Sequence, residues 1–167
     1  ISNNELNFDI SVVEPNLIKD NYNLISANKI KHYQSINDLK ETDFDTVLFA
    51  VKPQVISEVC LGVLENLDQK KIFSIISILA GTKVETFESY FGLSPIIRAM
   101  PNLAVSEGSG VTALYGNNNV NKFFKETTDK IFSGVGEVIW VNNEDMMDVV
   151  TSTSGSGPAY YLSLIHI

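Results

Sequence analysis

Two uninterrupted apolar runs, residues 46–51 and 72–78, restrict the fold more than any other feature of the chain. Each has the length of a β-strand and contains no charged residue, which is typical of a parallel strand covered on both faces. Between them, apolar residues recur at spacings of three and four from Val55 to Leu67, as in an amphipathic helix. Strand, helix and strand in this order predict a parallel βαβ unit.

The same alternation continues along the chain. We expect further strands at residues 9–14, 28–33, 95–100, 111–115 and 135–141, and further helices at residues 17–26, 84–91, 121–132 and 144–152. A short helix capped by Ser35 or Asn37 should reach residue 40. The sequence therefore predicts an α/β fold with a largely parallel sheet and helices on both faces. Strand patterning ends near residue 142, so we place a first domain at 1–142 and the start of a second at 143–167.

Composition excludes several classes of function. The net charge of −8 and the scattered positions of the 12 basic residues argue against nucleic-acid binding, which needs clustered Lys and Arg. The single cysteine, Cys60, excludes an internal disulfide, and its apolar neighbours predict a core position. His32 and His166 lie far apart, without Cys, Asp or Glu at metal-ligand spacing, so no metal site is expected. No apolar run reaches transmembrane length and no signal peptide is visible, which predicts a cytoplasmic protein without a membrane partner.

Candidate binding residues follow four of the apolar runs. In sheets of this kind, ligands bind outside the carboxyl ends of the strands. The polar and small residues at these strand exits are Glu14, Pro15, Asn16, Lys52, Pro53, Gln54, Ala80, Gly81, Met100, Pro101 and Asn102. Three of the four exits contain proline, which fixes φ and makes the exit rigid. One such exit is weak support for a site, whereas four around one crevice favour it.

Glu14 lies at the end of a predicted strand, where an acidic side chain can bind part of a ligand. An acidic residue at the end of the second strand of a dinucleotide-binding fold hydrogen-bonds the ribose hydroxyls. The strand and the G-x-G-x-x-G turn that would precede it do not occur before Glu14. The chain also lacks an initial Met, and the apolar residues 159–167 end without a cap or a polar exit. We therefore expect both ends to be incomplete. The alternative for Glu14 is a solvated residue before a turn.

Near the C-terminus, residues 152–157 combine small side chains with glycine before Pro158 and two tyrosines begin a helical run. Gly155 and Gly157 lack Cβ atoms, so another molecule or a backbone can approach closely. Pro158 suits a first helical turn, and the helix behind it would point N–H groups and its positive dipole end at the loop. The stretch is a candidate seat for an anion or a polar ring. The alternative is a tight loop that caps a helix.

Four motifs together resemble one family. They are AVKPQ (residues 50–54), SILAG (77–81), IRAMPN (97–102) and SGSGPAY (154–160). They occur in the order, and at about the spacing, of the pyrroline-5-carboxylate reductases. The similarity spans residues 10–161, and the set of motifs is far more specific than any one of them.

The resemblance implies a Rossmann-type domain that holds NADPH or NADH, followed by the start of an all-helical dimerisation domain. It implies hydride transfer to the C=N carbon of pyrroline-5-carboxylate, giving proline, in a homodimer or a higher homo-oligomer. The cofactor contacts expected from the resemblance and the strand exits are Glu14, Asn16, Asn37, Ala50, Val51, Lys52, Pro53, Ala80, Gly81, Met100 and Pro101. The remaining site residues implied are Asn102 and Glu144 near the reacting atoms, and Ser154, Gly155, Ser156 and Gly157 at the substrate end.

The sequence departs from the family at both ends. The glycine-rich turn and most of the helical domain are missing, so this chain alone is expected to be inactive or nearly so. Glu14 would repel the 2′-phosphate of NADPH, which leaves the choice between NADPH and NADH open. Two alternatives are a related imine or β-hydroxyacid reductase and a non-catalytic nucleotide-binding protein. The β-hydroxyacid enzymes usually rely on a lysine in the interdomain helix, and no lysine follows Lys130 here.

Overall fold

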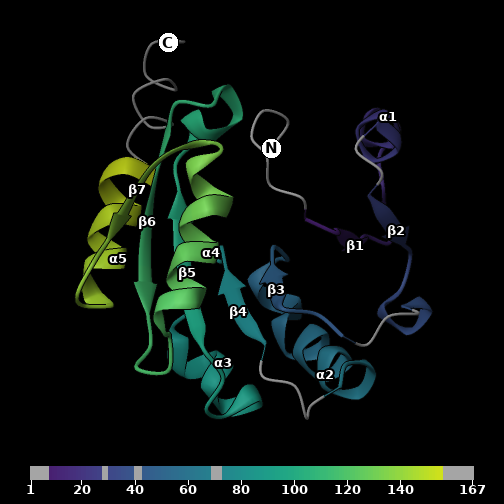
Figure 1. Ribbon diagram of the computed structural model, residues 1–167, viewed down its shortest axis with the longest axis horizontal. Helices are drawn as coiled ribbons and strands as arrows, with labels where there is room; N and C mark the ends of the chain where they lie inside the picture. Colours follow the sequence, from purple (N-terminus) through teal and green to yellow (C-terminus); the bar gives the residue numbers. More distant parts are fainter. Residues whose placement is uncertain (1–7, 28–29, 40–42, 69–72, 156–167) are drawn as a thin grey trace.

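The computed structural model describes residues 8–27, 30–39, 43–68 and 73–155, which form two separate sheets (Figure 1). The strands are β1 (Ser11–Val13), β2 (Lys31–Tyr33), β3 (Thr46–Phe49), β4 (Ser74–Ser77), β5 (Ile96–Pro101), β6 (Gly110–Gly116) and β7 (Gly136–Trp140). The helices are α1 (Lys19–Ala27), α2 (Ile56–Asn66), α3 (Val84–Phe91), α4 (Lys122–Ser133) and α5 (Asp145–Val150). The shorter elements are the 3₁₀ helices η1 (Ile36–Asp38), η2 (Pro53–Val55) and η3 (Leu103–Glu107) and the π-helical segment η4 (Thr151–Gly155).

The larger sheet has the strand order β3-β4-β5-β6-β7. Strands β3, β4 and β5 run parallel, β6 is antiparallel to β5, and β7 runs parallel to β6. The parallel part confirms the predicted βαβ unit. The one reversal lies between β5 and β6, where the connection is too short for a helical crossover. The smaller sheet pairs β1 with β2 in parallel, and within the described ranges no strand pairing joins it to the larger sheet.

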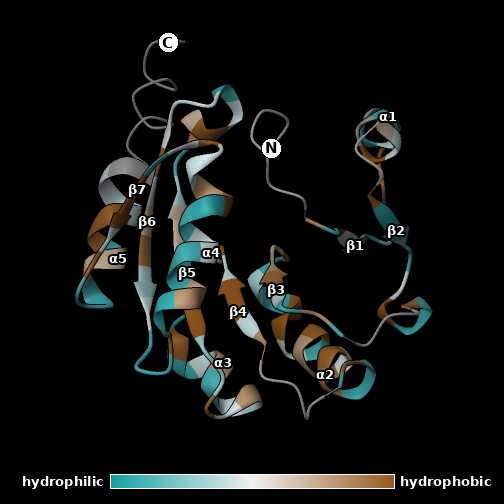
Figure 2. Cartoon of the chain, viewed as in Figure 1, coloured by the Kyte–Doolittle hydropathy of each residue, from teal (hydrophilic) through white to brown (hydrophobic). Residues whose placement is uncertain are grey.

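Strand β4 forms the centre of the core, because all four of its residues are buried. Ile75 lies in a cluster with Phe49 and with Phe87 of α3. Ile76 points to the opposite face, into a cluster with Phe124 of α4. Successive side chains of a strand point to opposite faces, so a strand covered on both faces must be apolar on both. The apolar character of β4 is visible in Figure 2.

The predicted strands and helices are confirmed, with shifts at their ends. Ser35 caps η1, as one of the two expected caps: its hydroxyl accepts the Asn37 N–H, and its own N–H donates to the Asp38 carboxylate. The helix η3 was not predicted from the sequence pattern. It ends at Gly108, whose φ of 69° is a left-handed conformation that glycine adopts at little cost. Residues 28–29 of the second predicted strand lie outside the described residues.

Three other expectations concern membranes, metals and domains. Among the described residues, no helix is long and apolar enough to cross a membrane. The same residues contain no group of three or more His, Cys, Asp or Glu side chains that could hold a metal ion. Met147 of α5 is 1% exposed, so the first helix after the predicted domain boundary is packed against described neighbours. The boundary itself stays a prediction.

The buried side chain of Asn117 ties the end of β6 to the start of β5. Its Oδ1 accepts the Ile96 N–H at 3.1 Å and the Asn119 N–H at 3.2 Å. Its Nδ2 donates to the Ser94 carbonyl at 3.1 Å and to the Glu88 carboxylate at 3.0 Å. The residue is 8% exposed, so little water can replace these partners. Four hydrogen bonds therefore depend on one side-chain amide.

We expect Asn117→Ala to lower the free energy of unfolding by about 3 kcal/mol, because the buried Ile96 N–H and the half-buried Ser94 C=O lose their partner. Urea denaturation followed by the fluorescence of Trp140, the single tryptophan, measures the change. The control is Asn118→Ala at the exposed neighbouring position, which should shift the same free energy by less than about 0.5 kcal/mol. Equal stability of the two variants would contradict the prediction.

Burial raises the pKa of the Cys60 thiol on α2 from 9.0 to about 11. As pH rises, the unfolded chain loses the thiol proton before the folded chain does. The stability that the neutral thiol contributes is therefore present below pH 9.0 and is lost as pH rises toward about 11. Across this pH range, the free energy of unfolding should fall less steeply with rising pH in Cys60→Ala than in the wild type. Rapid labelling of the native thiol by iodoacetamide at neutral pH would speak against its burial.

Candidate functional site

The exits of β3, β4 and β5 lie at one edge of the larger sheet, because these three strands run parallel. The Ile78 N–H donates to the Phe49 carbonyl at 3.1 Å, which holds the first residue after β4 beside the end of β3. Ala50 and Ala80, which follow on the two strands, are both exposed. The structure therefore brings three of the four predicted exits to one edge.

The exit of β3 is an exposed turn that leads into α2. Pro53 stands in the first turn of η2, where a missing backbone N–H costs nothing. The Lys52 carbonyl accepts the Val55 N–H at 3.1 Å and closes the turn. Val51 is half-buried, whereas Lys52 and Pro53 are exposed. The exit presents one positive side chain and a rigid backbone to any ligand at this edge.

The exit of β4 leaves open space beside its backbone. The Ser77 hydroxyl accepts the Leu79 N–H at 3.3 Å, which shapes the end of the strand. Gly81 has φ of 70°, and a Cβ built there would meet no atom within 4 Å. Glycine at this position satisfies the left-handed backbone rather than a crowded neighbour. A ligand can therefore approach the Ala80–Gly81 backbone closely.

The exit of β5 places Asn102 between two strands. Its Oδ1 accepts the Val111 N–H at 3.1 Å, and its own N–H donates to the Val111 carbonyl at 3.2 Å. Met100 and Pro101, just before it, are half-buried. The Nδ2 group of Asn102 makes no hydrogen bond to another described residue. Asn102 thus holds the β5–β6 connection and keeps two donors for a ligand.

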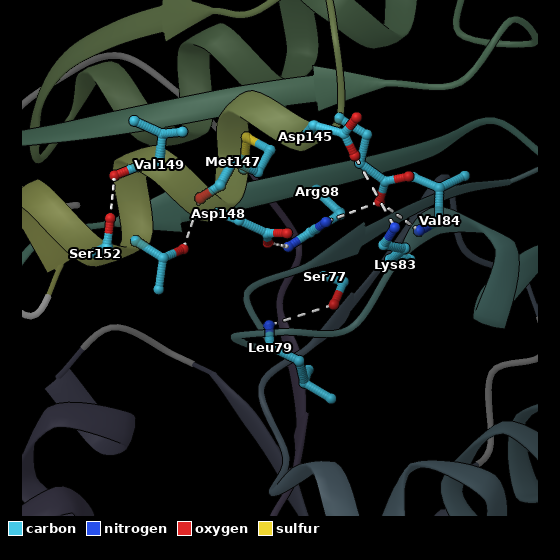
Figure 3. Close-up of polar contacts among 12 residues, drawn as sticks. Ser77, Leu79, Lys83, Val84, Arg98, Asp145, Met147, Asp148, Val149 and Ser152 are labelled. Atoms are coloured by element: carbon cyan, nitrogen blue, oxygen red, sulfur yellow. Dashed lines mark hydrogen bonds and ion pairs between the residues drawn. The ribbon is translucent and has the colours of Figure 1, made fainter.

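An ion-pair cluster lies on the inner side of α5 (Figure 3). The Arg98 side chain is 3% exposed, and its Nη1 donates to Glu144 Oε1 at 2.8 Å. Its Nη2 lies 3.5 Å from Asp148 Oδ1. The same Glu144 oxygen accepts the Val84 N–H at 2.8 Å. The predicted site residue Glu144 is therefore held by a buried guanidinium and by the start of α3.

Glu144 was predicted from the sequence, whereas its neighbours Arg98 and Asp148 were not. A signal for Arg98 was present, because a charged residue inside a buried apolar strand is found only where it is paired. The partner could not be read from the sequence, because Arg98 and Glu144 are 46 positions apart.

Among the described residues, no hydrogen bond or ion pair joins Glu14, Asn16 or Asn37 to the three exits. Glu14 directly follows β1 of the smaller sheet, and its carboxylate accepts the Asn16 N–H at 2.8 Å. The Asn37 Oδ1 accepts a hydrogen bond from Asn66 Nδ2 at 3.1 Å. Asn66 is the last residue of α2, whereas the exit of β3 leads into the first residues of that helix. The described contacts thus place Asn37 at the far end of α2 from the exit.

The predicted substrate segment is described only in part. Ser154 and Gly155 lie within η4, and Ser156 and Gly157 lie outside the described residues. The Thr151 hydroxyl donates to the Met147 carbonyl at 2.7 Å, and the Thr153 hydroxyl donates to the Val149 carbonyl at 2.8 Å. These hydroxyls satisfy carbonyls at the end of α5. The segment Thr151–Gly155 therefore continues the helix and does not form an open loop.

The fold and the edge of strand exits define the class of protein. A largely parallel sheet with helices on both faces, open turns at the carboxyl edge and a glycine in one of them are the features of a Rossmann-like domain.

Pyrroline-5-carboxylate reductases are among the relatives of highest sequence identity, although no protein-family model matches the chain. The pyrroline-5-carboxylate reductase of Pseudomonas aeruginosa is 36% identical over 124 residues, which cover 74% of this chain and 45% of that protein. The pyrroline-5-carboxylate reductase of Coxiella burnetii superposes with a TM-score of 0.81 at 32% identity, covering 94% of this chain and 57% of that one. The Plasmodium falciparum pyrroline carboxylate reductase, solved with NADP bound, gives 0.70 at 29% identity, covering 82% of this chain and 51% of that one.

The chain belongs to the pyrroline-5-carboxylate reductase family and corresponds to its N-terminal, NAD(P)-binding part. It spans about half the length of the curated relatives that it matches. The resemblance seen in the sequence motifs and the expected Rossmann-like fold are thereby confirmed.

Proposed function

We propose that the full-length protein carrying this sequence reduces 1-pyrroline-5-carboxylate to proline with NADPH or NADH. The observation that carries the proposal is that three exits bearing the family's motifs lie at one edge of a Rossmann-like sheet. The sequence similarity to pyrroline-5-carboxylate reductases, over 74% of the chain, supports the same reaction. The 167-residue chain by itself is expected to be inactive or nearly so, because it spans about half of those relatives.

The residues present fit a dinucleotide at the strand exits. The open backbone at Gly81 leaves room for a flat ring, and the exposed Lys52 offers a positive charge to a polar or anionic group. In this proposal the reduced nicotinamide supplies the hydride, and the protein supplies position and exclusion of water. The residues that would hold the cofactor there are Ala50, Val51, Lys52, Pro53, Ala80, Gly81, Met100 and Pro101.

The proposed roles at the reacting end go to two polar residues, Asn102 at the exit of β5 and Glu144 just before α5. The donors of Asn102 Nδ2 suit contact with the substrate or the nicotinamide amide. Glu144 is the second candidate, with its carboxylate already bonded to Arg98 and Val84. Ser154, Gly155, Ser156 and Gly157 are proposed to shape the substrate end. No nucleophile is required, because hydride transfer forms the new C–H bond directly and a proton then completes the amine.

Glu14, Asn16 and Asn37 remain proposed contacts on the adenosine side of the cofactor. Assembly as a homodimer or a higher homo-oligomer, and a cytoplasmic location, also stay predictions.

Loss of reduced-nicotinamide absorbance with 1-pyrroline-5-carboxylate tests the reaction directly, with NADPH and NADH in parallel and the full-length protein as the enzyme. We expect turnover with at least one of the two cofactors. A folded protein that binds a cofactor but turns over with neither would reject this substrate in favour of a related imine or β-hydroxyacid reductase.

Gly81→Ala should weaken cofactor binding, because a methyl group would enter the open space beside the strand exit. The matched control is Gly92→Ala at the other end of α3, where φ is 59° and the surroundings are equally open. Both substitutions should destabilise the protein, because a side chain is strained at a positive φ. Only Gly81→Ala should raise the Kd of the reduced cofactor, by about tenfold, in a fluorescence titration. An equal Kd in both variants would remove Ala80–Gly81 from the proposed cofactor site.

Glu14→Ala should shift cofactor preference toward NADPH, because it removes a carboxylate that would repel the 2′-phosphate. We expect the ratio of the Kd for NADH to that for NADPH to rise about tenfold, measured on the full-length protein. Glu58→Ala, at an exposed position of α2, is the charge-matched control and should leave the ratio unchanged. A strong preference for NADPH that Glu14→Ala does not alter would refute a role for Glu14.

A further inference from the structure

The ion pair between Arg98 and Glu144 is short, and both of its side chains are largely shielded from water. Arg98 is carried by β5 and is 3% exposed, so its charge is cut off from water and must be paired. The pairing is unequal. The Glu144 oxygen lies at 2.8 Å and that side chain is 19% exposed, whereas the Asp148 oxygen lies at 3.5 Å and that side chain is 60% exposed. Glu144 is therefore the partner that compensates the Arg98 charge.

The same Glu144 oxygen holds the start of α3. It accepts the Val84 N–H at 2.8 Å, although the two residues are 60 positions apart. Lys83, the N-cap residue of α3, makes no side-chain cap hydrogen bond. A carboxylate at a helix N-terminus satisfies an N–H that has no partner within the helix and is favoured by the helix dipole. Glu144 thus caps α3 from a distant part of the chain.

Two segments of the proposed site leave from this cluster. The Ala80–Gly81 turn ends three residues before Val84. On the other side, α5 begins directly after Glu144 and continues into the segment Thr151–Gly155. Figure 3 shows Arg98 between the side chains of α5 and the start of α3. One carboxylate therefore fixes the starting points of both segments.

We propose that Arg98 is a positioning residue: by holding Glu144, it fixes the Ala80–Gly81 turn relative to the segment Thr151–Gly155. The inference rests on the proposed function, which assigns the turn to the cofactor and assigns Ser154 and Gly155, the last two residues of the segment, to the substrate end. Hydride transfer needs donor and acceptor carbons in close contact, so a displacement of about 1 Å between the two sides costs about 100-fold in rate. Arg98 acts through Glu144 and needs no contact with either ligand.

The main variant is Arg98→Met in the full-length protein, because Met fills much of the same space without the charge. We expect kcat with 1-pyrroline-5-carboxylate to fall by at least about tenfold. The Kd of the reduced cofactor, titrated without substrate, should stay within about twofold of the wild type. A residue that served stability alone would lower the melting temperature and leave kcat of the folded protein unchanged.

The double variant Arg98→Met/Glu144→Gln guards against a folding defect. It removes both charges of the pair, and the Gln side chain keeps an oxygen for the Val84 N–H. We expect a melting temperature closer to the wild type than that of Arg98→Met, because no buried charge is left unpaired. The kcat of this folded variant should still lie at least about tenfold below the wild type, because the ion pair is absent. Lys83→Met is the matched control, since it removes only the exposed 4.0 Å contact with Asp145 and should keep full kcat.

Hydrogen exchange tests the connection without any turnover. In Arg98→Met, the amides of residues 82–86 and 145–153 should exchange at least about tenfold faster together, and in Lys83→Met they should not. A wild-type protein without turnover would reject the proposed function, and the exchange result would then decide alone whether Arg98 couples the two segments. Full kcat in Arg98→Met, or faster exchange at only one of the two segments, would overturn the inference.

Discussion

Burial of β4 on both faces is the constraint on which the rest of the structure depends. Ile75 and Ile76 are both 0% exposed and point to opposite faces of the sheet. Burial of each such side chain contributes about 1.5–3 kcal/mol, and this gain requires α2 and α3 on one face and α4 on the other. The chain leaves β3 and β4 at the same edge of the sheet, and from there it enters α2 and α3, the helices that cover the strands. The position of the candidate site therefore follows from how the core is covered.

At the end of the apolar core, a charged residue of β5 replaces an apolar one. Along β5, Ile96 belongs to the α2 and α3 side of the core, and Arg98, two residues later on the same face, is paired with carboxylates from α5. An apolar residue at that position would pack against α5 without choosing one arrangement. A guanidinium with a carboxylate at 2.8 Å has a defined geometry. Burial of apolar side chains thus stabilises the packing of the helices on the sheet, and the Arg98–Glu144 ion pair fixes the position of α5.

Most of the fold could be predicted from the sequence, because its elements follow from local patterns. The helix α3 has the range that its apolar spacing indicates, and the exposed turn at Ala80–Gly81 follows a strand whose end is marked by glycine. The reversal between β5 and β6 could not be predicted, because strand patterns carry no sign of direction. The pairing of Arg98 with Glu144 was equally hidden, since it depends on how α5 returns to the sheet. The hydrogen bond between Asn37 and Asn66 at the end of α2 could not be predicted either, because it is a long-range contact that no local pattern encodes.

The antiparallel step at β6 has a consequence for how the chain is routed. Because β6 and β7 both run opposite to β5, β7 ends on the side of the sheet away from the exits. The chain must then travel back, and Figure 1 shows α5 running toward the edge at which β4 ends. Helix α5 and η4 together give a rise of about 16 Å, close to the length of the strands beside them. The antiparallel pairing of β5 with β6 thus decides at which edge of the sheet α5 ends. Without this reversal, α5 would carry the segment Thr151–Gly155 away from the strand exits. With it, α5 carries that segment toward them.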